Sequence, residues 1–143
     1  KAEAANAKLS LNQALAKSQL EIKRRQSKIQ QELKDKIFEE ADALIDEFMK
    51  TEAYDDFLIK CIRKAVNFAG NDELTIYINP TDEKKRSDLE DATRVHLTIS
   101  TEDFRGGVRA VIRSRNILID NSFSTQLKEQ YDKFVFLGGD GIA

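Results

Sequence analysis

No glycine or proline occurs before Gly70, and this absence constrains the fold more than any other feature of the 143-residue chain. The first segment is instead rich in Ala, Leu, Lys, Gln and Glu, which are strong helix formers. They predict one long helix from about residue 1 to about residue 49. At ~1.5 Å per residue such a helix runs on the order of 70 Å, longer than a compact domain of this size can cover. We therefore expect a helical stalk joined to a smaller domain.

Aromatic and charged residues divide the chain at the same place. All eleven Phe and Tyr residues lie at Phe38 or later. Residues 1–37 carry nine Lys or Arg against four Asp or Glu, a net charge of +5, whereas the remainder carries 14 against 21, a net charge of -7. The sequence therefore predicts two parts: a basic stalk helix over residues 1–37 and an acidic globular domain over residues 38–143.

The predicted stalk has a thin apolar row with a period of eleven residues. Eleven residues correspond to about 3.67 per turn, so a partner helix that follows the row would wind around the stalk with a right-handed supercoil. The expected partner-helix interface consists of Leu11, Leu15, Ile22, Ile29, Leu33 and Ile37. The alternative is a solvated single helix, because the row also includes the polar residues Ser18 and Gln26.

The remaining segments alternate between helical and strand patterns. Apolar spacing predicts a second helix from Thr51 or Glu52 to Gly70 and a last helix that begins near Ser122 and ends at Gly138-Gly139. Period-two alternation predicts strands at 74–79, 95–100, 108–113 and 117–120, with a short exposed helix in 81–93. We expect an α+β domain in which a small, mostly antiparallel four-stranded sheet packs against helices, behind the long stalk helix.

Residues with catalytic or metal-binding chemistry are few. Cys61 lies on an apolar helix face and His96 on the polar side of a strand, so we expect a buried thiol and an exposed imidazole. One Cys and one His cannot form a common zinc site, and no phosphate-binding glycine loop occurs. No segment approaches the ~20 apolar residues of a spanning helix, and a single Cys fits a reducing compartment. We expect no catalytic, cofactor-binding or metal-binding residues and no membrane insertion.

Two segments carry a resemblance to a known family. Asp103-Phe104-Arg105-Gly106-Gly107-Val108 and Asp120-Asn121-Ser122-Phe123 resemble the peripheral-stalk E subunit of the V-type and A-type rotary ATPases. In that family a Gly-Gly-Val strand leads through a turn to an Asp-Asn cap that opens the last helix. The positions that match are Gly106, Gly107, Val108, Asp120 and Asn121.

The resemblance implies a mechanical and non-catalytic function without cofactors. The stalk helix would form a 1:1 heterodimer with a second, small helical stalk protein, the G subunit (F or H in some prokaryotes), and the C-terminal domain would grip the catalytic A/B head. A membrane-proximal helical segment that precedes Lys1 would reach the stator subunit of the membrane sector. The stator would resist rotor torque while ATP turnover is coupled to H+ or Na+ transport, on the cytoplasmic side and peripheral to the membrane.

Other functions remain open at this point. A stator-like regulator of an export or secretion ATPase would share the same architecture. A nucleic-acid-binding helical module could use Lys23, Arg24, Arg25 and Lys28 together with the arginines at 105, 109, 113 and 115, although no aromatic residue for base stacking lies near the first cluster. An enzyme without a recognisable motif is the remaining alternative. The resemblance favours the stator, which does not require nucleic acid.

Overall fold

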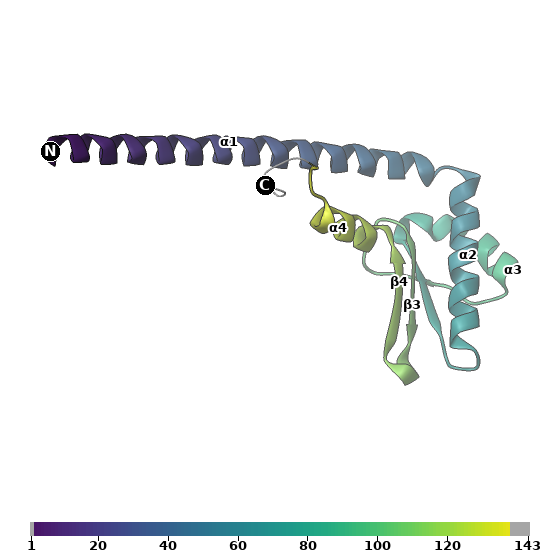
Figure 1. Ribbon diagram of the computed structural model, residues 1–143. Helices are drawn as coiled ribbons and strands as arrows, with labels where there is room; N and C mark the ends of the chain where they lie inside the picture. Colours follow the sequence, from purple (N-terminus) through teal and green to yellow (C-terminus); the bar gives the residue numbers. More distant parts are fainter. Residues whose placement is uncertain (1, 138–143) are drawn as a thin grey trace. The chain divides into compact units, whose positions relative to one another are not determined.

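The computed structural model describes residues 2–137 of the chain (Figure 1). Their elements are α1 (Ala2–Phe48), α2 (Glu52–Ala69), β1 (Thr75–Ile78), η1 (Pro80–Lys85), α3 (Arg86–Thr93), β2 (Thr98–Ile99), β3 (Gly107–Ile112), η2 (Arg113–Arg115), β4 (Ile117–Ser122) and α4 (Phe123–Lys133), where η marks a short 3-10 helix. The described residues form two units, one of residues 2–40 with 134–137 and the other of residues 41–133. The predicted α+β class with a long first helix is confirmed.

Helix α1 is the long helix that the sequence predicts. It has 47 residues, and none of them is buried, as expected for a polar helix with a sparse apolar row. It ends at Phe48, whose carbonyl accepts hydrogen bonds from the Thr51 amide at 3.0 Å and from the Thr51 hydroxyl at 2.6 Å. These bonds satisfy a carbonyl that the helix leaves without a partner. Helix α2 then begins at Glu52, so the predicted break between the two helices is confirmed.

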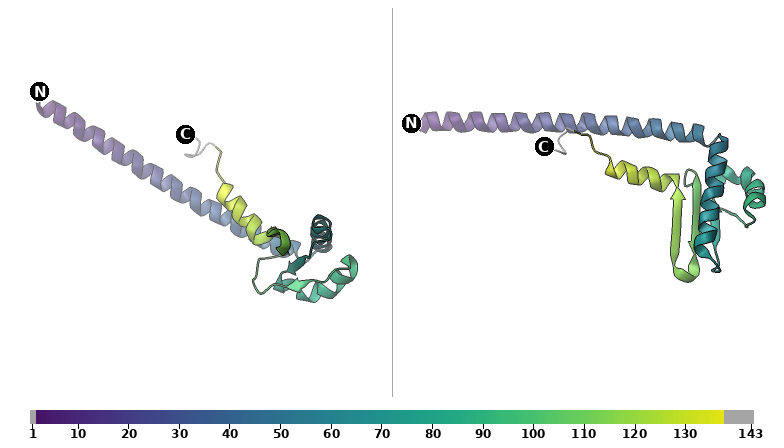
Figure 2. Two further views of the ribbon diagram at one scale, coloured as in Figure 1. Left: turned by 90° about the horizontal axis from the view of Figure 1, so that it is seen from below. Right: turned by 45° about the vertical axis from the view of Figure 1, so that its right-hand side comes forward.

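The sheet has the order β2-β1-β3-β4 and is mostly antiparallel, as predicted. Strand β3 pairs antiparallel with β1 and with β4, whereas β2 pairs parallel with β1. Helix α2 lies along one face of the sheet (Figures 1 and 2). The core between them contains apolar side chains from α2, the strands and the segments that connect them: Tyr54, Leu58, Cys61, Ile62, Ala65, Ile76, Ile78, Leu89, Leu97, Val108, Ala110 and Phe123. The predicted burial of Cys61 is thus confirmed, and this burial raises the pKa of the thiol.

Strand β2 is much shorter than the predicted strand over 95–100. Only Thr98 and Ile99 pair with β1. Arg94 ends α3 with a left-handed backbone (φ 61°), and the amide of Leu97 donates a hydrogen bond of 2.8 Å to the Glu90 carboxylate. Because this amide bonds a side chain near the end of α3, it is not available for a sheet ladder. His96 is 81% exposed, which confirms its predicted exposure.

Helix α4 also ends earlier than predicted. Its last residue is Lys133, whereas the sequence pattern extended the helix through Phe134 to Gly138-Gly139, which lie outside the described residues. The residues after Lys133 are Phe134, Val135 and Phe136, which are aromatic or β-branched and have lower helix propensity. The Phe134 ring packs edge-to-face against Phe38, with ring centroids 5.7 Å apart. Phe134 therefore belongs to the same unit as the first part of α1 rather than to the sheet domain.

Arg105 fastens the last two turns of α1, residues 41–48, within the unit of residues 41–133. Its Nε and Nη2 donate to the Asp42 carboxylate and the Asp42 carbonyl, each at 2.7 Å, and its Nη1 lies 2.8 Å from the Asp46 carboxylate. The hydrogen bond to Asp42 raises the pKa of Arg105 above its ordinary value. Ile45 and Met49 pack beside this ion pair against the core.

Replacing Arg105 with Gln should loosen the end of α1 while leaving the sheet folded. The change removes three hydrogen-bonded contacts, and because Asp42 and Asp46 are about half exposed we expect a loss of about 1–2 kcal/mol in the free energy of unfolding. Amide hydrogen exchange of residues 41–48 should accelerate. The matched control is Arg115→Gln, which removes a 2.8 Å ion pair to Asp72 and should leave exchange of residues 41–48 unchanged. Equal acceleration in both variants would contradict this role.

Candidate functional site

The most prominent exposed feature of the chain is the apolar row of α1. The six predicted interface residues, Leu11, Leu15, Ile22, Ile29, Leu33 and Ile37, are 36–63% exposed. At about 100° per residue, these six positions fall within about 80° of one another around the helix axis. Exposed Leu and Ile in a continuous row are the usual mark of a protein contact surface. The geometry is compatible with a partner helix, and the role of these residues stays a prediction.

A different face of the same helix is covered by the chain itself. Phe134, Val135 and Phe136 border a hollow of about 250 Å³ together with Ser27, Gln30, Gln31 and Lys34 of α1. Phe38, whose ring contacts Phe134, lies about half a turn around the helix from Ile29 and about 100° from Ile37, the nearest residue of the apolar row. The segment 134–136 thus covers one face of α1 and leaves the row exposed. The sequence pattern missed this contact because it placed Phe134 inside the last helix.

Four of the residues that carry the family resemblance lie together where β3 begins and β4 ends. They are Gly106, Gly107, Val108 and Asn121. Val108 pairs with Asn121 in the antiparallel ladder. Gly107 has φ +85°, and a Cβ atom at this position would lie 2.2 Å from the Asn121 carbonyl oxygen. A Cβ at Gly106 would lie 2.9 Å from Met49 and from Phe123. Close packing against the backbone of β4 therefore explains the glycine at 107, and close packing against the Met49 and Phe123 side chains explains the glycine at 106.

A buried hydrogen-bond network joins the glycine pair to α2 and η1. The Gly107 amide donates to the Tyr54 hydroxyl at 3.0 Å, and this hydroxyl donates to the Asp82 carboxylate at 2.5 Å. Tyr54 and Asp82 are both buried. Burial raises the pKa of both groups, and the hydrogen bond to Asp82 raises that of Tyr54 further. Lys85 lies over the Tyr54 ring at 4.8 Å and pairs with Asp55 at 2.7 Å.

Asp120 acts at the start of α4 from a position inside β4. Its carboxylate accepts hydrogen bonds from the Ser122 amide at 2.9 Å and from the Thr125 hydroxyl at 2.8 Å. Burial alone would raise the pKa of Asp120, but these bonds and the charge of Arg109 outweigh it and hold the pKa below its usual value. Asp120, Asn121 and Ser122 are the last three residues of β4, and Ser122 directly precedes the first residue of α4. The expected Asp-Asn cap is therefore an Asp120–Ser122–Thr125 arrangement.

Several of the arginines that a nucleic-acid surface would need are already engaged. Arg105 binds Asp42 and Asp46, as described above. Arg109 lies 3.4 Å from Asp120 and 3.3 Å from Glu102, with its guanidinium over the Phe104 ring. Arg115 binds Asp72 and the carbonyl of Phe68. A carboxylate that neutralises an arginine lowers its attraction for phosphate. Three of the four arginines named in the nucleic-acid hypothesis are therefore paired with carboxylates in the structure.

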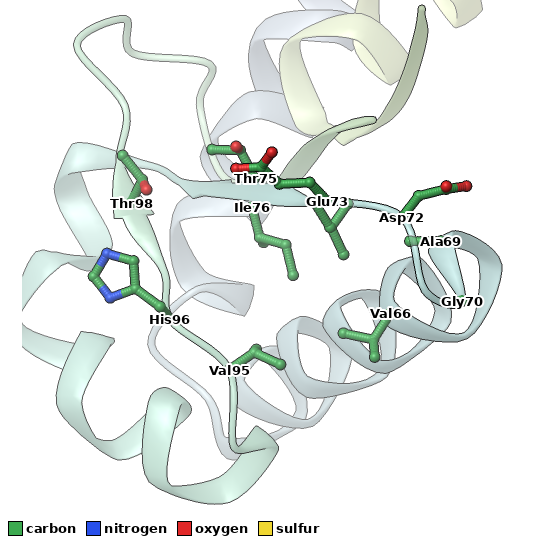
Figure 3. A pocket seen from close by; sticks show the side chains of 11 residues that line it. Val66, Ala69, Gly70, Asp72, Glu73, Thr75, Ile76, Val95, His96 and Thr98 are labelled. Carbon is green, nitrogen blue, oxygen red and sulfur yellow. The ribbon is translucent and has the colours of Figure 1, made fainter. Parts of the chain in front are cut away.

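Among the hollows of the unit of residues 41–133, two are formed by more than one helix or strand. One, of about 330 Å³, is mainly apolar and is lined by Leu44, Ile45, Phe48, Phe123, Gln126, Leu127 and Gln130. The other, of about 470 Å³, lies between the end of α2, the start of β1 and the segment before β2 (Figure 3). The sequence pattern indicated neither hollow, because each is formed by segments far apart along the chain.

The described residues offer no metal site of the usual kind. Within residues 2–137, no three His, Cys, Asp or Glu side chains gather as a group that could hold a metal ion. None of the helices in this range combines the length and the apolar character needed to cross a membrane. The candidate sites described above are the row on α1 and the hollows of the two units.

No protein-family model matches the chain, and no curated protein matches it. A functional assignment therefore rests on the residues and the geometry described above.

Replacing Gly107 with Ala should disrupt the β3–β4 junction. The new Cβ would clash with the Asn121 carbonyl oxygen, and alanine is unfavourable in the left-handed conformation of this residue. We therefore expect the free energy of unfolding to fall by about 3 kcal/mol or more. Gly70→Ala is the matched control, because Gly70 also has positive φ (+60°) but has no atom within 4 Å of the new Cβ. Its cost should be about 1–2 kcal/mol. Chemical denaturation of both variants measures the difference, and equal losses would contradict the proposed steric conflict.

Asp82 and Asp120 should influence the pH dependence of stability in opposite directions. The folded-state pKa of Asp82 is raised. Its contribution to the free energy of unfolding is therefore complete below pH 3.8, the ordinary pKa of an Asp, and is lost as the pH rises through the folded-state pKa. The folded-state pKa of Asp120 is lowered. Its contribution to the free energy of unfolding is therefore present above pH 3.8 and is lost as the pH falls through the folded-state pKa.

Denaturant titrations of the wild type, Asp82→Asn and Asp120→Asn between about pH 2 and pH 7 test these signs. As the pH falls, the wild type should gain stability relative to Asp82→Asn and lose it relative to Asp120→Asn. At neutral pH, Asp120→Asn should cost about 1–2 kcal/mol, because the carboxylate accepts two hydrogen bonds. Parallel pH profiles for the three proteins would show that neither carboxyl has the inferred shift.

Proposed function

We propose that the chain is the non-catalytic E-type subunit of the peripheral stalk in a V-type or A-type rotary ATPase. The observation that carries the proposal is the exposed apolar row of α1, with its eleven-residue period on a helix without glycine or proline. A helix of this kind gains stability by pairing along its length, since its own side chains bury little. The junction of Gly106, Gly107 and Val108 with Asn121 adds support, because its packing gives these motif residues a structural role.

In this proposal α1 pairs with the small helical protein of the stalk, the G subunit (F or H), as a 1:1 heterodimer with a right-handed twist. Each half-exposed Leu or Ile of the row would contribute about 1 kcal/mol when the partner covers it. The domain that follows would bind the catalytic A/B head, and the stator subunit of the membrane sector would hold the other end of the stalk. The complex would couple ATP turnover to H+ or Na+ transport on the cytoplasmic side, peripheral to the membrane.

The function of the subunit would be mechanical. A stator must transmit torque without yielding, and it needs no nucleophile, acid–base pair or metal. The fastening of residues 41–48 by Arg105 supports this function, since it ties the end of the long helix to the domain through charged hydrogen bonds. A stator-like regulator of an export ATPase would use a similar helix, but no observation here favours it over the rotary stalk.

Substitutions in the row test the proposed pairing. When the chain is mixed with the small stalk subunit of the same organism at micromolar concentration, size-exclusion chromatography should show a 1:1 complex with a raised melting temperature. Ile22→Asp and Leu33→Asp should abolish this complex, because each buries a carboxylate at an apolar contact. Hydrogen exchange of residues 41–133 should stay unchanged in both variants, which shows that the domain remains folded.

Gln13→Asp is the matched control for Ile22→Asp. Gln13 lies nine residues before Ile22, about half a turn around the helix, so the same new carboxylate would face away from the row. This variant should form the complex normally. Failure of the wild type to pair, or normal pairing of both row variants, would count against the stator assignment.

A further inference from the structure

The apolar hollow within residues 41–133 has a helix on each side. Leu44 and Phe48 lie on its α1 side, Leu127 lies on its α4 side, and its volume is about 330 Å³. The polar side chains that line it are the uncharged amides of Gln126 and Gln130. No charged side chain of the described residues lines it, so its chemistry suits apolar side chains.

The apolar side chains at this hollow are left in contact with water. Leu44 is 70% exposed, Phe48 is 36% exposed and Leu127 is half-buried. Phe123 lines the same hollow and is buried, with its ring centroid 6.3 Å from that of Phe48. The domain therefore folds without filling this space, and an occupant would remove apolar surface from water.

The two exposed residues continue the series of the row on α1. Leu44 stands eleven residues after Leu33, and Phe48 stands eleven residues after Ile37, on a helix that runs without interruption to Phe48. At about 100° per residue, Leu44 falls within the sector of the row, and Phe48 falls about 20° beyond it. A helix that follows the row with the same period therefore arrives at Leu44 and Phe48.

The walls of the hollow favour a helix as its occupant. All of its lining residues belong to α1 or α4. Helices pack by fitting rows of side chains between those of their neighbours, and an amphipathic helix can lay its apolar face into an apolar groove. A helix that covers the series from Leu11 to Phe48 needs about 37 residues, on the order of 55 Å.

We propose that the helix paired with the row continues into this hollow and packs between the end of α1 and α4. Its apolar side chains would cover Leu44, Phe48 and Leu127, so that three helices meet within the domain. The inference rests on the proposed function for its occupant, the small helical subunit of the stalk, and adds α4 to the surface that this subunit binds. The subunit would then be attached to the domain of residues 41–133 as well as to the stalk helix.

Amide hydrogen exchange of the full chain, alone and mixed with the small stalk subunit of the same organism, tests the proposal. Exchange of residues 11–37, 44–48 and 123–130 should slow in the complex. Slower exchange of residues 11–37 with unchanged exchange of residues 123–130 would overturn this inference and leave the pairing along the row in place. Failure to form a complex would overturn both.

Substitutions on the two walls locate the contact. Leu127→Gln makes the α4 wall polar without adding charge, so binding of the small subunit should weaken by about fivefold to thirtyfold. Residues 123–130 should lose their protection while residues 11–37 keep theirs. Glu129→Gln places the same side chain at an exposed position of α4 that does not line the hollow, and it should bind normally.

Leu44→Gln keeps the test decisive even if Leu127→Gln destabilises the domain. Leu44 is 70% exposed, so its side chain contributes little to the folding of the free chain. Binding should weaken by a factor similar to that of Leu127→Gln. Normal binding of both variants would overturn the proposal.

A second copy of the chain is the competing occupant of the hollow. If exchange of residues 123–130 slows as the concentration of the free chain increases, and the small subunit causes no further slowing, the hollow joins two copies and the proposal is overturned. Slowing that appears only with the small subunit supports it.

Discussion

The Tyr54 hydroxyl is the contact on which the sheet domain depends. It accepts a hydrogen bond from the Gly107 amide and donates one to the Asp82 carboxylate, so that a single buried oxygen links α2, β3 and η1. Its ring also meets Phe48, Phe57 and Phe123 at centroid distances of 5.7–6.4 Å. Removing a polar pair of this kind from water costs free energy, and only complete hydrogen bonding in the interior offsets that cost. The strand that supplies this amide needs glycine at 107, because φ is +85° there and a Cβ would meet the Asn121 carbonyl oxygen.

The same region explains how the long helix joins the domain. Arg105 stands two residues before Gly107 and has a left-handed backbone (φ 77°), a conformation that non-glycine residues seldom adopt. With the backbone in this conformation, the Arg105 guanidinium reaches the carboxylates of Asp42 and Asp46. Backbone strain at Arg105 is thus offset by charged hydrogen bonds to α1. The loop before β3 therefore contributes both to the core and to the anchoring of residues 41–48.

Local patterns predicted the parts of the fold that depend on nearby residues. Helix α1, the break at Thr51, the end of α2 at Gly70 and the strand positions of β1, β3 and β4 follow from propensity, periodicity and turn residues. The row from Leu11 to Ile37 is exposed, as a surface that binds a partner helix must be.

The features that the sequence missed depend on contacts between distant positions. Asp82 lies in a polar run and gives no sign that Tyr54, 28 residues earlier, will bury it. Glu90 shortens β2 by bonding the Leu97 amide, and Phe38 draws Phe134 away from the last helix. The hollow beside β1 arises from the same shortening. Single-sequence periodicity carries no information about such pairs, because each partner is ordinary in its own local context.

The row on α1 also bears on the fate of a chain that has not yet assembled. From Leu11 to Ile37 it presents Leu and Ile side chains to water at every turn or two, which is the kind of surface that chaperones and quality-control proteases recognise. A helix that covers the row would conceal this signal. Under the proposed pairing, the lifetime of the chain in the cell would depend on the supply of its partner, and copies in excess of that partner would be degraded.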